Sequence, residues 1–261
     1  MQATQLLLEI GPYGIQKSYF TSPLKLGTPK TEDGRRKIVL MMASAGVLKG
    51  DAFEYRIHCH KGTSALITEQ SYTKIFDTGD GIAKRTQHII LEEGASLLYC
   101  PQAVVPFAGS SFDSTLNFDI RENSELLCTD IVTAGRVGMG ERFLFQRYRS
   151  RICVCLDGKP VWIDNCILEP GQTDMGNMIL FDDYTHMGTL YYYGKDSEKK
   201  EDRIGTFCSG ERQHIKVGIS KALRGVCVRV LAHTAQDIEE FFVECMEWIE
   251  LNLSGDSTSP A

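Results

Sequence analysis

The feature that most constrains the fold is a pattern that repeats from residue 37 to about residue 165. Runs of five to eight residues rich in Val, Ile, Leu, Tyr, Phe and Thr alternate with turns that contain Gly or Asp, such as residues 61–63 and 157–160. Runs of this kind, bounded by turn-forming residues, are typical of β-strands. Because no long helix fits between them, the pattern excludes a βαβ sheet and favours stacked antiparallel or solenoid-like sheets.

Residues 52–60 show the two-residue period of a half-buried strand. Apolar side chains fall on one face and polar side chains on the other: Phe53, Tyr55, Ile57 and Cys59 against Glu54, Arg56, His58 and His60. Successive side chains of a strand point to opposite faces. We therefore expect the first set in a core and the second set in water.

The C-terminal part of the chain has a helical period instead. Between residues 235 and 253 one side is apolar and the other rich in glutamate, the apolar side being Ile238, Phe241, Phe242, Cys245, Met246 and Ile249. Thr234 and Asp237 form a plausible N-terminal cap. We predict one mainly β domain over residues 1–253, closed by an amphipathic helix over 235–253 and followed by a loose tail over 254–261. The mixed-charge run 195–203 is predicted to be a solvated loop.

Composition narrows the possible partners and the compartment. The formal net charge is −6, and no basic stripe of the kind that nucleic acid requires occurs in the sequence. Nine cysteines sit mostly inside apolar runs, which fits a reducing cytoplasm. No basic start followed by a long apolar run is found near residue 1, and no run reaches the ~18 apolar residues of a membrane span. We expect a cytoplasmic protein that binds proteins or a cation, with no nucleic acid and no membrane.

His58 and His60 form the first candidate metal site. The strand period places Cys59 on the opposite face and leaves two imidazoles on the polar face at positions i and i+2. Imidazole is a suitable ligand for nickel and zinc. The alternative is that both histidines belong to an ordinary exposed polar face.

Asp51, Arg136 and Glu141 form the second candidate set. Each lies in a glycine-rich segment next to an apolar strand, where a charge is costly unless it is paired or useful. One alternative is an internal Arg136 ion pair or network that fixes the packing of two sheets. The other is that the two carboxylates face an internal, water-filled path and bind a cation weakly through oxygen.

Six strings in one order resemble a known family. They are residues 45–51, 68–74, 97–101, 135–143, 164–168 and 223–232, with the sequences AGVLKGD, TEQSYTK, LLYCP, GRVGMGERF, DNCIL and LRGVCVRVLA. In this order and spacing the chain resembles the urease accessory protein UreD, also called UreH, from about residue 20 to about 250. Two positions, Ala45 and Lys49, depart from the residues more usual there.

The resemblance implies a fold and a function. It implies two packed sheets in a broad β-helix-like or sandwich arrangement with a few helices, including the one at the C-terminus. It also implies a non-catalytic urease maturation chaperone that scaffolds urease apoprotein with a UreF-like accessory protein and, through it, a UreG-like GTPase. Nickel would be passed on transiently, without a tightly bound cofactor.

Carried over residue by residue, the resemblance covers three motifs. The matching positions are Gly46, Gly50 and Asp51 in the first, Thr68, Gln70 and Lys74 in the second, and Gly135, Arg136, Gly140 and Glu141 in the third. On this basis Asp51 and Glu141 are the candidate ligands of a transient nickel path. Two alternatives remain open: a β-rich hydrolase or lyase with Asp51 and Glu141 as acid and base, and a purely structural adaptor.

Overall fold

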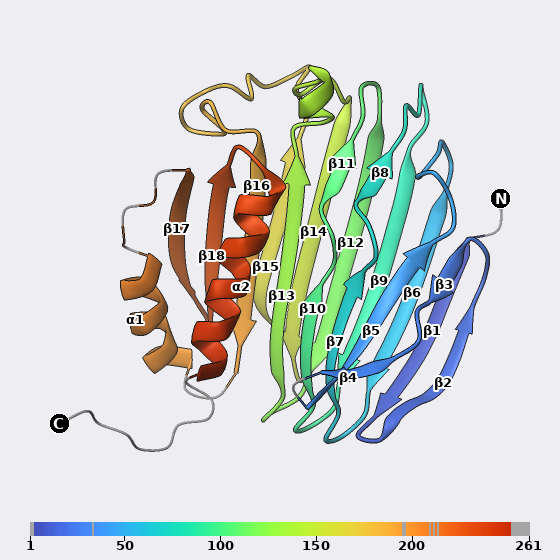
Figure 1. Cartoon of the computed structure of the whole chain (residues 1–261), viewed down its shortest axis with the longest axis vertical. Coiled ribbons are helices and arrows are strands. Elements are labelled where there is room, and N and C mark those ends of the chain that lie inside the picture. The colour runs from blue at the N-terminus through green and yellow to red at the C-terminus, as the bar shows by residue number, and fades with distance from the viewer. Residues whose placement is uncertain are drawn as a thin grey trace.

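The structure, a computed structural model, describes residues 3–32, 34–194, 197–208, 210, 212 and 214–251 (Figure 1). Within these residues the strands form two sheets. Sheet A has the order β15 (Lys159–Leu168), β14 (Arg147–Leu156), β12 (Ser111–Ile120), β9 (Ala83–Leu91), β6 (Ala52–Cys59), β1 (Thr4–Gly11) and β2 (Gly14–Phe20). Sheet B has the order β17 (Ile215–Ala222), β18 (Gly225–Ala232), β16 (His186–Tyr193), β13 (Glu125–Thr133), β10 (Ser96–Cys100), β7 (Ser64–Glu69), β5 (Arg35–Met42) and β3 (Leu24–Leu26). Three short strands join sheet B at its side: β4 (Lys30–Glu32), β8 (Thr73–Ile75) and β11 (Val104–Pro106).

The chain between β5 and β14 winds as a broad coil, alternating between the two sheets. Neighbouring strands of the coil are parallel within each sheet, as in the pairs β6–β9, β9–β12 and β12–β14 of sheet A and β7–β10 of sheet B. Passages from sheet A to sheet B are short turns such as 60–63 and 92–95, which we call the short-turn end. Passages from sheet B to sheet A are longer loops such as 43–51 and 134–146, which we call the long-loop end. The predicted β-rich architecture of two packed sheets is confirmed.

A large hydrophobic core fills the space between the sheets. The alternation predicted for residues 52–60 is confirmed, because Phe53, Tyr55, Ile57 and Cys59 are all buried there. Trp162 of β15 stacks on Tyr191 of β16, with ring centroids 4.3 Å apart and planes 5° apart. This aromatic pair joins sheet A directly to sheet B.

A second apolar layer lies between the outer face of sheet B and two helices, α1 (Ser197–Cys208) and α2 (Ala235–Leu251) (Figure 1). The predicted apolar side of α2 packs here, with Ile238 and Phe242 at most 2% exposed. Gly188 of β16 makes the close approach possible, since a Cβ at that position would lie 2.9 Å from Cζ of Phe242. The backbone N–H of Asp237 donates to Oγ1 of Thr234 at 3.1 Å, which confirms the predicted cap.

Helix α1 corrects one expectation. Residues 195–203 were expected to form a solvated loop, but residues 197–203 begin a helix that extends to Cys208. The sequence run lacks apolar residues, yet Ile204 and Cys208 follow it at helical spacing and are buried. Lys200 is also buried, and its Nζ donates to the hydroxyl of Tyr192 at 2.6 Å. Residues 252–253 of the predicted C-terminal helix, and the predicted tail 254–261, lie outside the described residues.

All nine cysteines fall within the described residues, where each is a free thiol. Six of them are buried, in agreement with their expected role as small apolar side chains. Burial raises the pKa of the Cys59 and Cys166 thiols to about 12. Along the described part of the chain, no helix is both long enough and apolar enough to span a membrane.

Candidate functional site

The first and second motifs lie against each other at the long-loop end. The N–H of Val47 donates to the carbonyl of Lys74 at 2.8 Å, and the N–H of Phe76 donates to the carbonyl of Val47 at 2.9 Å. Gly46 is required by this contact, because a Cβ there would lie 2.7 Å from the Lys74 carbonyl oxygen. The backbone pairing therefore fixes the loop before β6 on the strand β8.

The third motif forms a compact turn around the 3-10 helix η1 (Val137–Met139). Gly135 and Gly140 have φ angles of +124° and +81°, a region that side-chain-bearing residues rarely adopt. Between them Arg136 reaches across the turn to Glu141: Nε lies 2.9 Å from Oε2, and Nη2 forms a second, short bond to Oε1. This is a two-point, fork-like ion pair.

Aromatic rings connect the third motif to the other two. The guanidinium of Arg136 lies over the ring of Phe107, 4.4 Å from its centroid. Phe107 in turn makes an edge contact with Phe76, with centroids 5.0 Å apart. The N–H of Ala108 donates to Oε2 of Glu141 at 3.3 Å. Segments almost 100 residues apart in sequence thus form one continuous structure.

The two candidate carboxylates are engaged in different ways. Oδ2 of Asp51 accepts a hydrogen bond from the N–H of Leu48 at 2.8 Å, which closes the turn that contains Gly50 with φ +76°. Both oxygens of Glu141 are bound by Arg136, whose hydrogen bonds hold the pKa of that carboxyl below its ordinary value. The structure therefore contains an Arg136 ion pair, but this pair closes a single loop and its arginine side chain is 42% exposed, so it is not an internal pair that fixes the packing of two sheets.

The polar residues of the second motif differ in their settings. Thr68 is half-buried in β7, where it pairs with Val39 of β5. Gln70 is exposed, and its N–H donates to the carbonyl of Leu40 at 2.9 Å. Lys74 is exposed in β8.

Large apolar side chains are exposed around the same end. Leu48, Met139 and Leu144 are 56%, 76% and 57% exposed, and each belongs to a loop from sheet B to sheet A. Met178 and Ile179, in the loop between β15 and β16, are also exposed, and this loop lies beside η1 at the upper end of the molecule in Figure 1. We use the name motif surface for the three motif segments, residues 45–51, 68–74 and 135–143, together with the neighbouring Leu144. Leu48 and Met139 lie within these segments.

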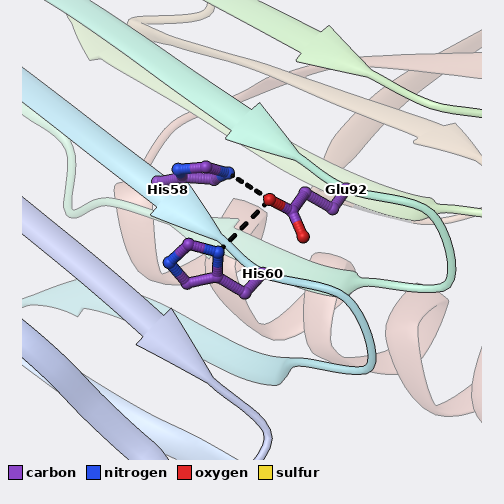
Figure 2. A group of neighbouring side chains, drawn as sticks. All are labelled: His58, His60 and Glu92. Atoms are coloured by element: carbon purple, nitrogen blue, oxygen red, sulfur yellow. Dashed lines mark hydrogen bonds and ion pairs between the residues drawn. The ribbon is translucent and has the colours of Figure 1, made fainter.

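His58 and His60 lie at the other end of the strands. They occupy the outer face of sheet A, at the short-turn end, and a third side chain, Glu92, reaches them from the turn after β9 (Figure 2). Among the described residues this is the group of three potential ligands whose donor atoms lie within 4.8 Å of one another. Asp51 and Glu141 are not part of it.

Comparison with known proteins identifies the family. The family model for the UreD urease accessory protein matches residues 9–261. The chain is 34% identical to the urease accessory protein UreH of Helicobacter pylori strain G27, over 90% of this chain and 89% of that protein. It is 31% identical to the urease accessory protein UreD of Acetivibrio thermocellus, over 86% of this chain and 87% of that protein.

The chain belongs to the UreD family. A match over nearly the whole chain means that the motif surface, the coil and the helical layer all fall inside the region shared with urease accessory proteins.

This UreD-family chain also has buried polar pairs that the sequence interpretation missed. Two such pairs link sheet A to sheet B through the core. Nη1 of Arg85 lies 3.2 Å from Oε1 of Glu69, and both side chains are about nine-tenths buried. The hydroxyl of Ser150 donates to Asp130 at 2.7 Å. A third pair also joins the two sheets, with Nη2 of Arg229 2.9 Å from Oδ1 of Asp164, but its arginine side chain is 42% exposed.

A sequence signal for these residues did exist. Glu69 follows Ala65 and Ile67 on the inward side of an alternating strand, and Asp130 follows Cys128 in the same way. Burial raises the pKa of both carboxyls above their ordinary values, although Arg85 opposes this at Glu69. An acidic residue at a position where the two-residue alternation places the side chain in the core is the sequence pattern that predicts such buried carboxylates.

Proposed function

We propose that this protein is a non-catalytic urease maturation chaperone that binds its partners through the motif surface. Membership of the UreD family gives the chain a role in urease maturation. The partners we propose are urease apoprotein and a UreF-like accessory protein, with a UreG-like GTPase bound through the latter. The observation that carries the proposal is the convergence of three motif segments at one end that also exposes Leu48, Met139 and Leu144. Clustered exposed apolar side chains are typical of protein-binding surfaces.

The enzyme alternative is supported less well by the geometry. A general acid or base must be within reach of the proton it transfers and free to exchange it. Arg136 occupies both oxygens of Glu141, and Asp51 uses one oxygen to hold the Leu48 amide. Both carboxylates thus have a structural task that explains their presence in the glycine-rich loops.

We further propose that nickel is handled as transient cargo, with Asp51 the better candidate of the two predicted carboxylates. Asp51 uses one oxygen in the turn, whereas Glu141 uses both in the ion pair. Oxygen ligands in small number hold a borderline cation weakly, so that it can be passed on. Glu141 supports this role indirectly, by holding the third motif closed.

The docking part of the proposal predicts a localised loss of binding. Leu48→Glu and Leu144→Glu each place a charge in the motif surface without disturbing the core, so we expect the folded variants to lose the UreF-like protein or urease apoprotein in co-purification. Leu223→Glu is the matched control, because Leu223 is 67% exposed in the β17–β18 turn at the short-turn end. Full binding by both motif-surface variants, or equal loss in the control, would contradict docking at this surface.

The nickel part predicts a separation of assembly from metal loading. Asp51→Asn keeps an oxygen for the Leu48 amide but removes the charge, so the variant should assemble normally while urease matured in the same cells contains less nickel. Glu141→Gln breaks the ion pair with Arg136 and should weaken assembly as well. The paired measurement is co-purification and the nickel content of purified urease. Normal nickel content with Asp51→Asn would leave the chaperone as a structural adaptor only.

A further inference from the structure

A cluster of three metal-ligand side chains lies at the short-turn end, far along the strands from the motif surface. Nε2 of His58 lies 2.8 Å from Oε1 of Glu92, and Nδ1 of His60 lies 3.2 Å from the same oxygen. The two imidazole rings are 4.2 Å apart, centroid to centroid. In Figure 2 both rings point toward the carboxylate, which reaches across from the neighbouring strand.

The register of two parallel strands produces this cluster. Strands β6 and β9 pair His58 with Ile90 and Cys59 with Leu91, which places His60 beside Glu92 at the start of the next turn. The turns repeat as well, because Gly62 and Gly94 have φ angles of +73° and +71°. The N–H of Glu92 donates to the carbonyl of Cys59 at 3.0 Å and fixes the two turns together.

Glu92 is oriented for ligation by its own hydrogen bonds. The N–H of Lys61 donates to Oε2 at 2.8 Å, so Oε1 is the oxygen turned toward the imidazoles. A carboxylate that is already oriented loses little freedom when it binds a cation.

One nitrogen of each imidazole converges on the same carboxylate oxygen, as the ligands of one metal ion would. Nε2 of His58 is buried and makes no hydrogen bond with the described residues, although Oε1 of Glu92 is 2.8 Å away. Nε2 of His60 lies 3.5 Å from Oε2 of Glu9 on β1, a carboxylate that can orient the ring from behind. Ligands bound to one metal at about 2.0–2.1 Å lie about 2.9–3.4 Å apart. The two nitrogen-to-carboxylate distances are close to that range.

We propose that His58, His60 and Glu92 form a surface site for one divalent transition-metal ion such as Ni²⁺ or Zn²⁺. Two imidazoles and one carboxylate suit these ions, whereas Mg²⁺ and Ca²⁺ require sets of oxygen ligands. Water would complete the coordination, since the side chains remain about one-third exposed. Metal binding at this site does not depend on the proposed function. A role for the site in holding nickel for urease does rest on the proposed function.

The test is metal binding to the purified full chain, measured by calorimetry with Ni²⁺, Zn²⁺ and Mg²⁺. We expect one Ni²⁺ or Zn²⁺ per chain and no Mg²⁺ binding. Glu92→Gln, which keeps an acceptor for the Lys61 amide, should weaken binding about 10- to 100-fold. The double variant His58→Gln, His60→Gln should abolish it.

Two matched control variants test whether the metal binds at His58, His60 and Glu92 and not at other potential ligands. His88→Gln removes another outward imidazole of sheet A, which pairs with Asp119 at 2.6 Å, and should leave binding unchanged. Cys153→Ser with Cys155→Ser removes two thiols whose sulfur atoms lie 3.7 Å apart, and should also leave it unchanged. Absence of binding in the unaltered chain, or loss only in the thiol variant, would overturn the proposal. Co-purification with the UreF-like protein is measured on the same samples, so a failure of the metal site is distinguishable from a failure of the scaffold.

Discussion

Replacing Glu69 by Gln is expected to destabilise the protein by about 3–5 kcal/mol, because it leaves the buried guanidinium of Arg85 without its counter-charge. The two side chains are 12% and 8% exposed, and their charged atoms are 3.2 Å apart. An arginine cannot relieve the cost by losing its proton. Urea unfolding followed by circular dichroism at pH 7 measures the loss.

The reverse substitution should behave differently. In Arg85→Met the pKa of Glu69, already raised by burial, loses the opposing effect of Arg85 and rises further above its unfolded value. The folded state then retains a proton that the unfolded state releases, so stability falls as pH rises from the unfolded pKa of about 4.3 through the folded pKa. Below that window the loss should be small. Equal, pH-independent losses in both variants would contradict this account.

A double variant separates pairing from packing. Glu69→Leu with Arg85→Met removes both charges, and a buried pair replaced by apolar side chains is often neutral in stability. We expect it to be more stable than Glu69→Gln alone. Asp113→Asn is the surface control, since Asp113 pairs with Arg149 at 3.3 Å on the outer face of sheet A and the change should have little effect.

Phe242→Ala is expected to cost about 3–5 kcal/mol and to loosen helix α2 from sheet B. Phe242 is 2% exposed and packs so close to Gly188 that position 188 has no room for a side chain. The cavity therefore opens where helix α2 packs closely on strand β16. Chemical unfolding gives the cost, and hydrogen exchange of the α2 amides shows the loosening.

Val243→Ala is the matched control for this helix. Val243 follows Phe242 directly but is 48% exposed, so its truncation should leave the unfolding free energy almost unchanged. If both variants lose the same stability, the loss does not come from the packing of Phe242 on the sheet.

The strands and the C-terminal helix could be predicted because their signals are local. The two-residue alternation of 52–60 and the helical spacing of 238–249 each depend on a few neighbouring residues, and the cap at Thr234 depends on a residue three positions away. Helix α1 was missed because the residues that anchor it, Ile204 and Cys208, follow the charged run where the helix begins.

The polar pairs could not be predicted because they depend on the register of the coil. Glu69 pairs with Arg85 across the core. Glu92 lies 32 residues after His60 in the sequence and contacts it across two neighbouring parallel strands. The pattern of a single strand shows neither contact. Aligning the two turns on Gly62 and Gly94 would have placed Glu92 beside His60, since both glycines serve the same turn geometry.

The two tryptophans lie in different layers of the molecule, so their intrinsic fluorescence can report on each layer separately. Trp162 stacks on Tyr191 between the sheets, and Trp248 stacks on Phe207 between α1 and α2, with ring centroids 6.1 Å apart. The sequence contains just these two. Trp248→Phe would leave emission that reports only on the contact between the sheets, and Trp162→Phe would leave emission that reports only on the helices. Titration of each variant with a partner would reveal which layer responds.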